Sequence, residues 1–225
     1  MPKKILIMAK KKAISKTNLI SFYMNYVLEY NEQPKSIYSF SKHNNFEESK
    51  FYSFFGSFEG IEKAIFKAFH ENTLNTLNNS DDYGPYDARN KLLSYYFTFF
   101  ENLNANRSYV TYVLADCKMS LKTLDKFSEL RKAFMTYIET LEIDTLEIKE
   151  ERLQKIQDRS LQESAWIQLM FTLKFWLDDT SASFEKTDIF IEKSVNASFD
   201  LISIKPLKSI IDLGKFLFKE KIPMH

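Results

Sequence analysis

The side chains that most often carry catalysis or metal binding are sparse and scattered in this sequence. Its three histidines, His43, His70 and His225, are far apart and show none of the spacings of a zinc site. The sequence also has no glycine-rich loop of the kind that cradles phosphates. These patterns predict that the chain is not an enzyme and uses neither a metal nor another cofactor. The single cysteine, Cys117, excludes an internal disulfide and favours the cytoplasm.

Basic side chains gather near the N-terminus. Residues 1–30 hold six lysines against one glutamate, Glu29, although the whole chain carries a net charge of only +1. A basic arm of this kind suggests contact with an anion, either nucleic acid or a membrane surface; a solvated tail is the open alternative. The apolar run "ILIMA" is far shorter than the roughly 20 residues of a membrane span. We therefore expect a soluble, cytoplasmic protein.

The composition predicts an all-α fold. Only four glycines and five prolines occur in 225 residues, too few for the turns of a sheet-rich protein. In the N-terminal part, apolar spacing predicts a helix over 17–30 that is capped by Thr17 or Asn18. Three more helices are expected: one over 37–43 after Ser36, a very short one from 47–49, and one over 58–77 after Ser57.

The most turn-rich segment, residues 78–88, reads as the boundary between two domains. We therefore predict a domain over 1–78 that contains the basic arm and the short helices, and a larger helical domain over 79–225. In the second domain, the expected helices cover 88–106, 107–119, 121–143, 148–179 with a possible interruption near 159–162, 183–202, and a last one from Pro206.

The N-terminal helices follow the order of a helix-turn-helix unit, with two short helices joined by a turn of three or four residues and a fourth helix as support. Here the sequence resembles the tetracycline-repressor-like (TetR) family of transcriptional regulators, most strongly over 18–69. Ser36-Ile37 stands where the family pattern has Thr-Val, and Asn44-Asn45-Phe46-Glu47 replaces Ala-Gly-Val-Ser. "FYSFF" (51–55) occupies the slot of Leu-Tyr-Tyr-His-Phe. The resemblance implies an N-terminal DNA-binding domain and a larger C-terminal ligand-binding and dimerisation domain.

The resemblance also implies which side chains meet double-stranded DNA. By position, Lys50 and Ser53 would reach base edges and Tyr52 a phosphate. The full predicted set is Lys35, Ser36, Lys42, Ser49, Lys50, Tyr52 and Ser53. Each lysine can equally be an ordinary solvated side chain, whereas Phe51, Phe54 and Phe55 are expected in the core.

Several positions depart from the family pattern. The two turn glycines are asparagines, Asn31 and Asn45, which tolerate a positive φ angle. Glu47 and Glu48 place carboxylates where phosphates would approach, which opposes binding to the DNA backbone. Phe58 stands in place of the usual lysine at the start of the fourth helix.

The C-terminal part resembles the family in layout only. Helices over 164–177 and 184–202 stand where the family forms a four-helix dimer interface, and the residues this implies are Trp166, Met170, Phe171, Trp176, Phe190, Val195 and Phe199. Other aromatic side chains could line an apolar cavity for a small effector: Tyr96, Phe99, Tyr109, Tyr112, Cys117, Phe134 and Trp166. Core packing within one chain is the alternative for both groups.

Two functions therefore stand side by side. The first is a homodimeric TetR-like regulator, a repressor that binds operator DNA and is released by a small apolar effector. The second is a TetR-fold module that no longer binds DNA and instead binds a lipid, an isoprenoid or another protein. Glu47, Glu48 and Phe58 favour the second function. So does the amphipathic last helix from Pro206, which could lie on a membrane surface or pack as a C-terminal cap.

Overall fold

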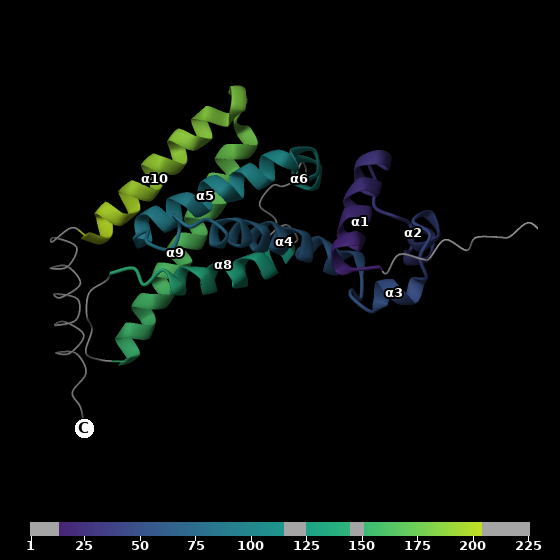
Figure 1. Cartoon of the computed structure of the whole chain (residues 1–225), viewed down its shortest axis with the longest axis horizontal. Coiled ribbons are helices and arrows are strands. Elements are labelled where there is room, and N and C mark those ends of the chain that lie inside the picture. Colours follow the sequence, from purple (N-terminus) through teal and green to yellow (C-terminus); the bar gives the residue numbers. More distant parts are fainter. Residues whose placement is uncertain (1–13, 115–124, 145–150, 204–225) are drawn as a thin grey trace, which may run out of the picture.

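The computed structural model describes residues 14–114, 125–144 and 151–203 (Figure 1). Within these ranges the regular structure consists of nine α-helices and one short 3-10 helix. The all-α prediction is confirmed. A small head, drawn in purple and blue at one end of Figure 1, projects from a larger helical bundle, which we call the core bundle. The basic arm, Cys117 and the last helix from Pro206 lie outside the described residues.

The head follows the predicted helix order closely. Helix α1 (Lys16–Tyr30) is followed by α2 (Ile37–His43), a short turn, and α3 (Glu48–Tyr52). The long helix α4 (Phe58–Asn78) then leads from the head into the core bundle (Figure 1). The pair α2 and α3 with its turn is the predicted helix-turn-helix.

Local capping explains where these helices begin and end. Ser36 and Ser57 cap α2 and α4 as predicted, but α1 is capped by Ser15 and not by Thr17 or Asn18. The hydroxyl of Ser15 accepts a hydrogen bond from the Asn18 amide at 3.1 Å, and the Asn18 side chain accepts one from the Ser15 amide at 3.1 Å. This reciprocal pair satisfies two amides that a helix start otherwise leaves without partners.

The two asparagines that replace turn glycines adopt the left-handed conformation. Asn31 ends α1 with a φ of 51°, and Asn45 lies in the turn between α2 and α3 with a φ of 55°. Asparagine is one of the few residue types that tolerate this region, because its short polar side chain can satisfy the local backbone. The substitutions therefore keep the turn geometry.

After α4 the chain is non-helical over residues 79–87, where the turn-rich sequence predicted a break. Helix α9 is continuous, so the interruption expected near 159–162 is wrong. The remaining elements are α5 (Ala88–Ala105), α6 (Arg107–Leu114), α8 (Ser128–Thr140), α9 (Glu151–Asp178), a 3-10 turn (Ala182–Phe184) and α10 (Glu185–Ser203).

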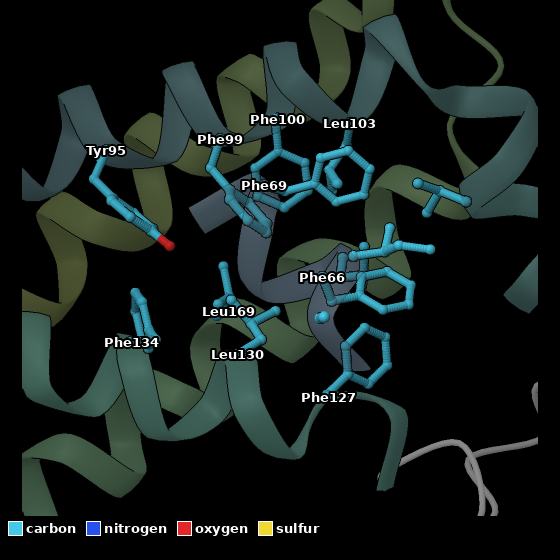
Figure 2. Packing of buried hydrophobic residues seen from close by; sticks show 14 of the residues in the cluster. Phe66, Phe69, Tyr95, Phe99, Phe100, Leu103, Phe127, Leu130, Phe134 and Leu169 are labelled. Atoms are coloured by element: carbon cyan, nitrogen blue, oxygen red, sulfur yellow. The ribbon is translucent and has the colours of Figure 1, made fainter. Parts of the chain in front are cut away.

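Helix α4 forms the centre of the bundle, packing against both α5 and α8. Figure 2 shows the rings of Phe66 and Phe69 on α4 meeting Phe99 from α5 and Phe127 at the start of α8. The rings of Phe66 and Phe127 lie 4.6 Å apart. Burying one such aromatic side chain contributes about 1.5–3 kcal/mol, so this layer anchors the helix that carries the head.

Candidate functional site

An aromatic cluster holds the two short helices of the head together. Phe40 of α2 is fully buried and lies edge-on to the rings of Phe46, at 5.6 Å, and Phe51, at 6.1 Å. Phe58, which stands where the family has a lysine, packs 5.7 Å from Phe40 and 5.5 Å from Tyr23. Phe58 therefore completes this cluster, which leaves other side chains of α2 and α3 exposed, among them Lys42, Lys50 and Tyr52.

The residues predicted to meet DNA all lie on the exposed surface of the head. Tyr52 is 55% exposed, and the Ser53 hydroxyl donates a hydrogen bond to the Ser49 carbonyl at 2.9 Å. Ser36 caps α2 and is exposed, so the N-terminal end of α2 faces solvent. The structure thus gathers Lys35, Ser36, Lys42, Ser49, Lys50, Tyr52 and Ser53 on α2, α3 and their flanking turns.

Two aromatic residues of the head were not anticipated at the surface. Tyr38 is 59% exposed, and the Lys42 ammonium lies 5.6 Å from its ring centre. The four-residue spacing of this pair on one short helix is the sequence signal that could have revealed it. Phe54 is 43% exposed, so its predicted place in the core is wrong, whereas Phe51 and Phe55 are buried as expected. The short helix α3 ends at Tyr52, which frees Phe54 from the helical face that Phe51 occupies.

Two carboxylates, those of Glu47 and Glu48, lie at the start of α3. Glu47 precedes the helix without capping it through its side chain, and Glu48 lies in its first turn. Together with Tyr38 and Lys42 they line a hollow of about 430 Å³ between α2 and α3. Acidic and basic side chains therefore share this part of the exposed surface.

A carboxylate joins the head to the core bundle. Glu62 of α4 accepts a 2.7 Å hydrogen bond from the Tyr23 hydroxyl of α1 and forms a 3.0 Å ion pair with Lys126, close to the start of α8. Burial and the nearby Glu62 carboxylate raise the pKa of Tyr23, so its hydroxyl remains protonated and able to donate. A second contact joins the two parts: the Tyr112 hydroxyl of α6 donates to the carbonyl of Asn31 at 2.7 Å.

The residues predicted to line an effector cavity divide into two groups. Tyr96, Phe99, Tyr109, Phe134 and Trp166 are buried, whereas Tyr112 is 37% exposed and faces the head, and Cys117 lies outside the described residues. Phe134 and Trp166 are neighbours, with ring centres 6.3 Å apart. The hydroxyls of Tyr96 and Tyr109 are buried without a hydrogen-bond partner among the described residues.

A groove that the sequence did not suggest lies between α4 and α8. Its volume is about 630 Å³, and its lining includes His70, Leu74 and Tyr137. The His70 ring is buried, which lowers its pKa to about 4, and its Nδ1 atom lies 2.7 Å from the Tyr95 hydroxyl. The sequence signal that could have indicated the burial of His70 was its position on the apolar face of α4, among Phe66, Phe69 and Thr73.

The residues predicted for a dimer interface are also divided. Trp166, Trp176 and Val195 are buried within the single chain, and Met170, Phe190 and Phe199 are half-buried, whereas Phe171 is 66% exposed. Ile167 and Phe175, one turn before and after Phe171, are exposed as well, and so is Ile189 of α10. The rings of Phe175 and Phe190 stack at 4.6 Å and connect the two helices.

Contacts around the turn between α9 and α10 hold these two helices in their relative positions. Burial favours the neutral form of Asp179, but hydrogen bonds from Ser181 and Thr187 outweigh that effect and hold its pKa below the usual range. The Arg107 guanidinium stacks between the rings of Trp176, at 4.4 Å, and Phe184, at 4.3 Å. These contacts fix the two helices against each other.

Within the described residues, no three histidine, cysteine, aspartate or glutamate side chains are arranged as a metal site would require. None of the helices in this part of the chain has the length and apolar character to cross a membrane.

Comparison with known proteins identifies the core bundle. No curated protein matches the chain. The family model described as the tetracyclin repressor-like C-terminal domain matches residues 91–217, which is more than half of the sequence. This match covers α8, which forms one wall of the groove, and the exposed α9–α10 surface, whereas α4, the other wall, precedes the matched residues. With its N-terminal helix-turn-helix and its matching C-terminal domain, the chain belongs to the tetracycline repressor-like family.

Proposed function

We propose that this protein is a transcriptional repressor that binds operator DNA as a homodimer and is released by a small apolar effector. The observation that carries the proposal is the exposed polar surface of α2 and α3, which is built on a buried aromatic cluster. A rigid short helix with lysine, serine and tyrosine side chains suits the major groove and its phosphate edges.

Within this surface, the roles follow from side-chain chemistry. Lys50 carries a flexible cation that can reach guanine acceptors, and the Ser53 hydroxyl, which donates to the Ser49 carbonyl, can accept from a base donor. Lys35, Lys42 and Tyr52 suit phosphate contacts, which fix the position of the head on DNA and contribute most of its salt-dependent affinity. Glu47 and Glu48 lower that affinity, so a larger share of the binding must come from base contacts.

A homodimer would present two such heads. The exposed apolar residues Ile167, Phe171, Phe175 and Ile189 on α9 and α10 supply a surface that a second copy could cover, and Phe171 is the one of these four that belongs to the predicted interface set. An effector held among the aromatic side chains of the core bundle would shift α4 and with it the spacing of the heads.

Selection from genomic DNA fragments, followed by a salt titration, tests this function. We expect one preferred site and a steep loss of affinity with rising salt. Lys50→Ala should weaken binding to that site by about 1–3 kcal/mol and relax the base preference. The matched control is Lys155→Ala, an exposed lysine of α9 that should leave binding unchanged.

Absence of DNA binding at low salt would refute the repressor and favour the second function, a lipid-binding or protein-binding module. Glu47 and Glu48 are the observation behind this alternative, since they flank the start of α3. Lipid extracted from the purified protein and identified by mass spectrometry would support it.

A further inference from the structure

We propose that the groove between α4 and α8 is the effector site, and that it takes an uncharged, mainly apolar molecule whose carbonyl oxygen accepts a hydrogen bond from His70. The argument that a ligand binds here uses the groove alone. The claim that this ligand is the effector that releases DNA rests on the proposed function.

The size and walls of the groove suit a small molecule. Its volume of about 630 Å³ falls within the range of sites for drug-sized ligands. Leu74 from α4 and Ala133 from α8 supply apolar walls, and the Tyr137 ring adds an aromatic surface. Behind it, the Tyr95 ring stacks on Tyr137 at 4.6 Å, so the groove is continuous with the aromatic cluster of the core bundle.

The hydroxyl of Tyr137 is not free to bind a ligand. It lies 2.9 Å from the Tyr83 hydroxyl and donates to the Lys91 carbonyl at 3.1 Å. Tyr137 therefore contributes its ring to the groove. The imidazole of His70 is the remaining buried polar group in the lining.

The contact with Tyr95 decides which nitrogen of His70 carries the proton. Because Tyr95 is fully buried, its hydroxyl hydrogen would lack an acceptor if Nδ1 were the donor, and an unpaired buried donor costs about 1–3 kcal/mol. Tyr95 therefore donates to Nδ1, and the neutral ring carries its hydrogen on Nε2. Burial keeps the ring neutral at pH 7 by lowering its pKa to about 4.

That tautomer places a single donor in the groove. His70 lines the groove and its Nδ1 is occupied by Tyr95, so we infer that Nε2–H is the group that the imidazole offers to a ligand there. It makes no hydrogen bond to the described residues. A ligand oxygen that accepts from Nε2–H would satisfy it, which selects a carbonyl group over a hydrocarbon of the same shape.

The charges around the groove cancel. Lys67 and Glu71 form an ion pair at 3.1 Å on α4, and Glu129 and Lys132 lie on α8. With the imidazole neutral, the lining has equal numbers of acidic and basic side chains. An uncharged ligand therefore fits it better than an anion or a cation does.

Two ligands of nearly identical shape test this assignment. Benzophenone carries a carbonyl where diphenylmethane carries a methylene group, so the pair differs mainly in the acceptor. We expect benzophenone to bind roughly three- to tenfold more tightly, the factor that one net hydrogen bond supplies. Binding is followed by histidine-selective NMR of the full chain, which has only three histidines to resolve.

The spectra also test the tautomer directly. The free protein should show His70 protonated on Nε2, and benzophenone should shift that resonance whereas diphenylmethane shifts it little. A ring protonated on Nδ1, equal affinity for the two ligands, or no binding of either would overturn the proposal.

Two variants locate the site. Ala133→Phe should fill the groove and abolish binding, whereas Ala105→Phe, at the exposed end of α5, should not. The double variant His70→Phe/Tyr95→Phe removes the donor without leaving a buried hydroxyl unpaired, and should bind both ligands equally. Unchanged binding by Ala133→Phe would place the ligand elsewhere and refute the site. All of these measurements omit DNA, so they remain informative if the repressor function fails.

Discussion

The hydroxyl of Tyr23 donates a 2.7 Å hydrogen bond to Oε1 of Glu62, across 39 positions of the sequence. This bond joins α1 of the head to α4, and the ion pair between Glu62 and Lys126 extends the contact into the core bundle. We expect Tyr23→Phe to destabilise the protein by about 1.5–3 kcal/mol, the range for a hydrogen bond to a charged group. Urea denaturation measures the change.

A double-mutant cycle separates this bond from the loss of either group alone. Tyr23→Phe, Glu62→Gln and the combined variant should give a coupling energy of about 0.5–3 kcal/mol. A coupling of zero would mean that the two side chains contribute independently and do not hold the head to α4.

The left-handed conformation of Asn45 gives a prediction about the turn. Asn45→Gly should change stability by only a few tenths of a kcal/mol, whereas Asn45→Ala should be about 1–2 kcal/mol less stable than the glycine variant. Asn72→Ala, at an exposed position within α4, is the control and should be neutral or slightly stabilising. Equal stability of Asn45→Gly and Asn45→Ala in thermal unfolding would contradict the backbone argument.

The buried imidazole of His70 makes stability depend on pH. Its pKa is about 4 in the folded chain and 6.5 when the ring is not buried, as in the unfolded chain. Between these pH values the unfolded chain therefore binds a proton that the folded chain does not. Stability should therefore fall as the pH is lowered through this window, by up to about 1.4 kcal/mol per pH unit from this group. His70→Gln should reduce the slope in urea denaturation from pH 7 to 4, and an unchanged slope would show that His70 is not responsible.

The exposed ring of Phe171 tests the homodimer. Phe171→Glu would place a charge in the middle of the apolar stripe between Ile167 and Phe175, and we expect it to weaken self-association by at least tenfold, about 1.4 kcal/mol. Sedimentation velocity over a concentration series measures the effect. Leu28→Glu, which alters an exposed apolar residue of the head, should leave association unchanged. An unaltered dimer in Phe171→Glu would exclude this surface.

Short-range features of the fold could be predicted from the sequence. The caps at Ser36 and Ser57 and the left-handed turns at Asn31 and Asn45 depend on neighbouring residues, and the structure confirms them. The cap of α1 was misplaced because Thr17 and Asn18 also have capping side chains, and only the reciprocal bonds of Ser15 with Asn18 decide between them.

Features that depend on distant contacts could not be predicted. The burial of Trp176 and the groove beside His70 depend on how helices far apart in the sequence pack together. The Tyr83 and Tyr137 hydroxyls, which meet across 54 positions, are an example. The roles predicted for the surface residues of the head are a different matter, because they depend on a partner molecule and stay predictions until DNA binding is measured.

Helix α4 has a further consequence for engineering the protein. Its first turns complete the aromatic cluster of the head, and its later turns bury Phe66 and Phe69 between α5 and α8. A fragment cut at residue 78 would keep the helix-turn-helix but expose these phenylalanines to water, which invites aggregation. Grafting this head onto another regulator would therefore require that the recipient supply a matching hydrophobic groove for the second half of α4.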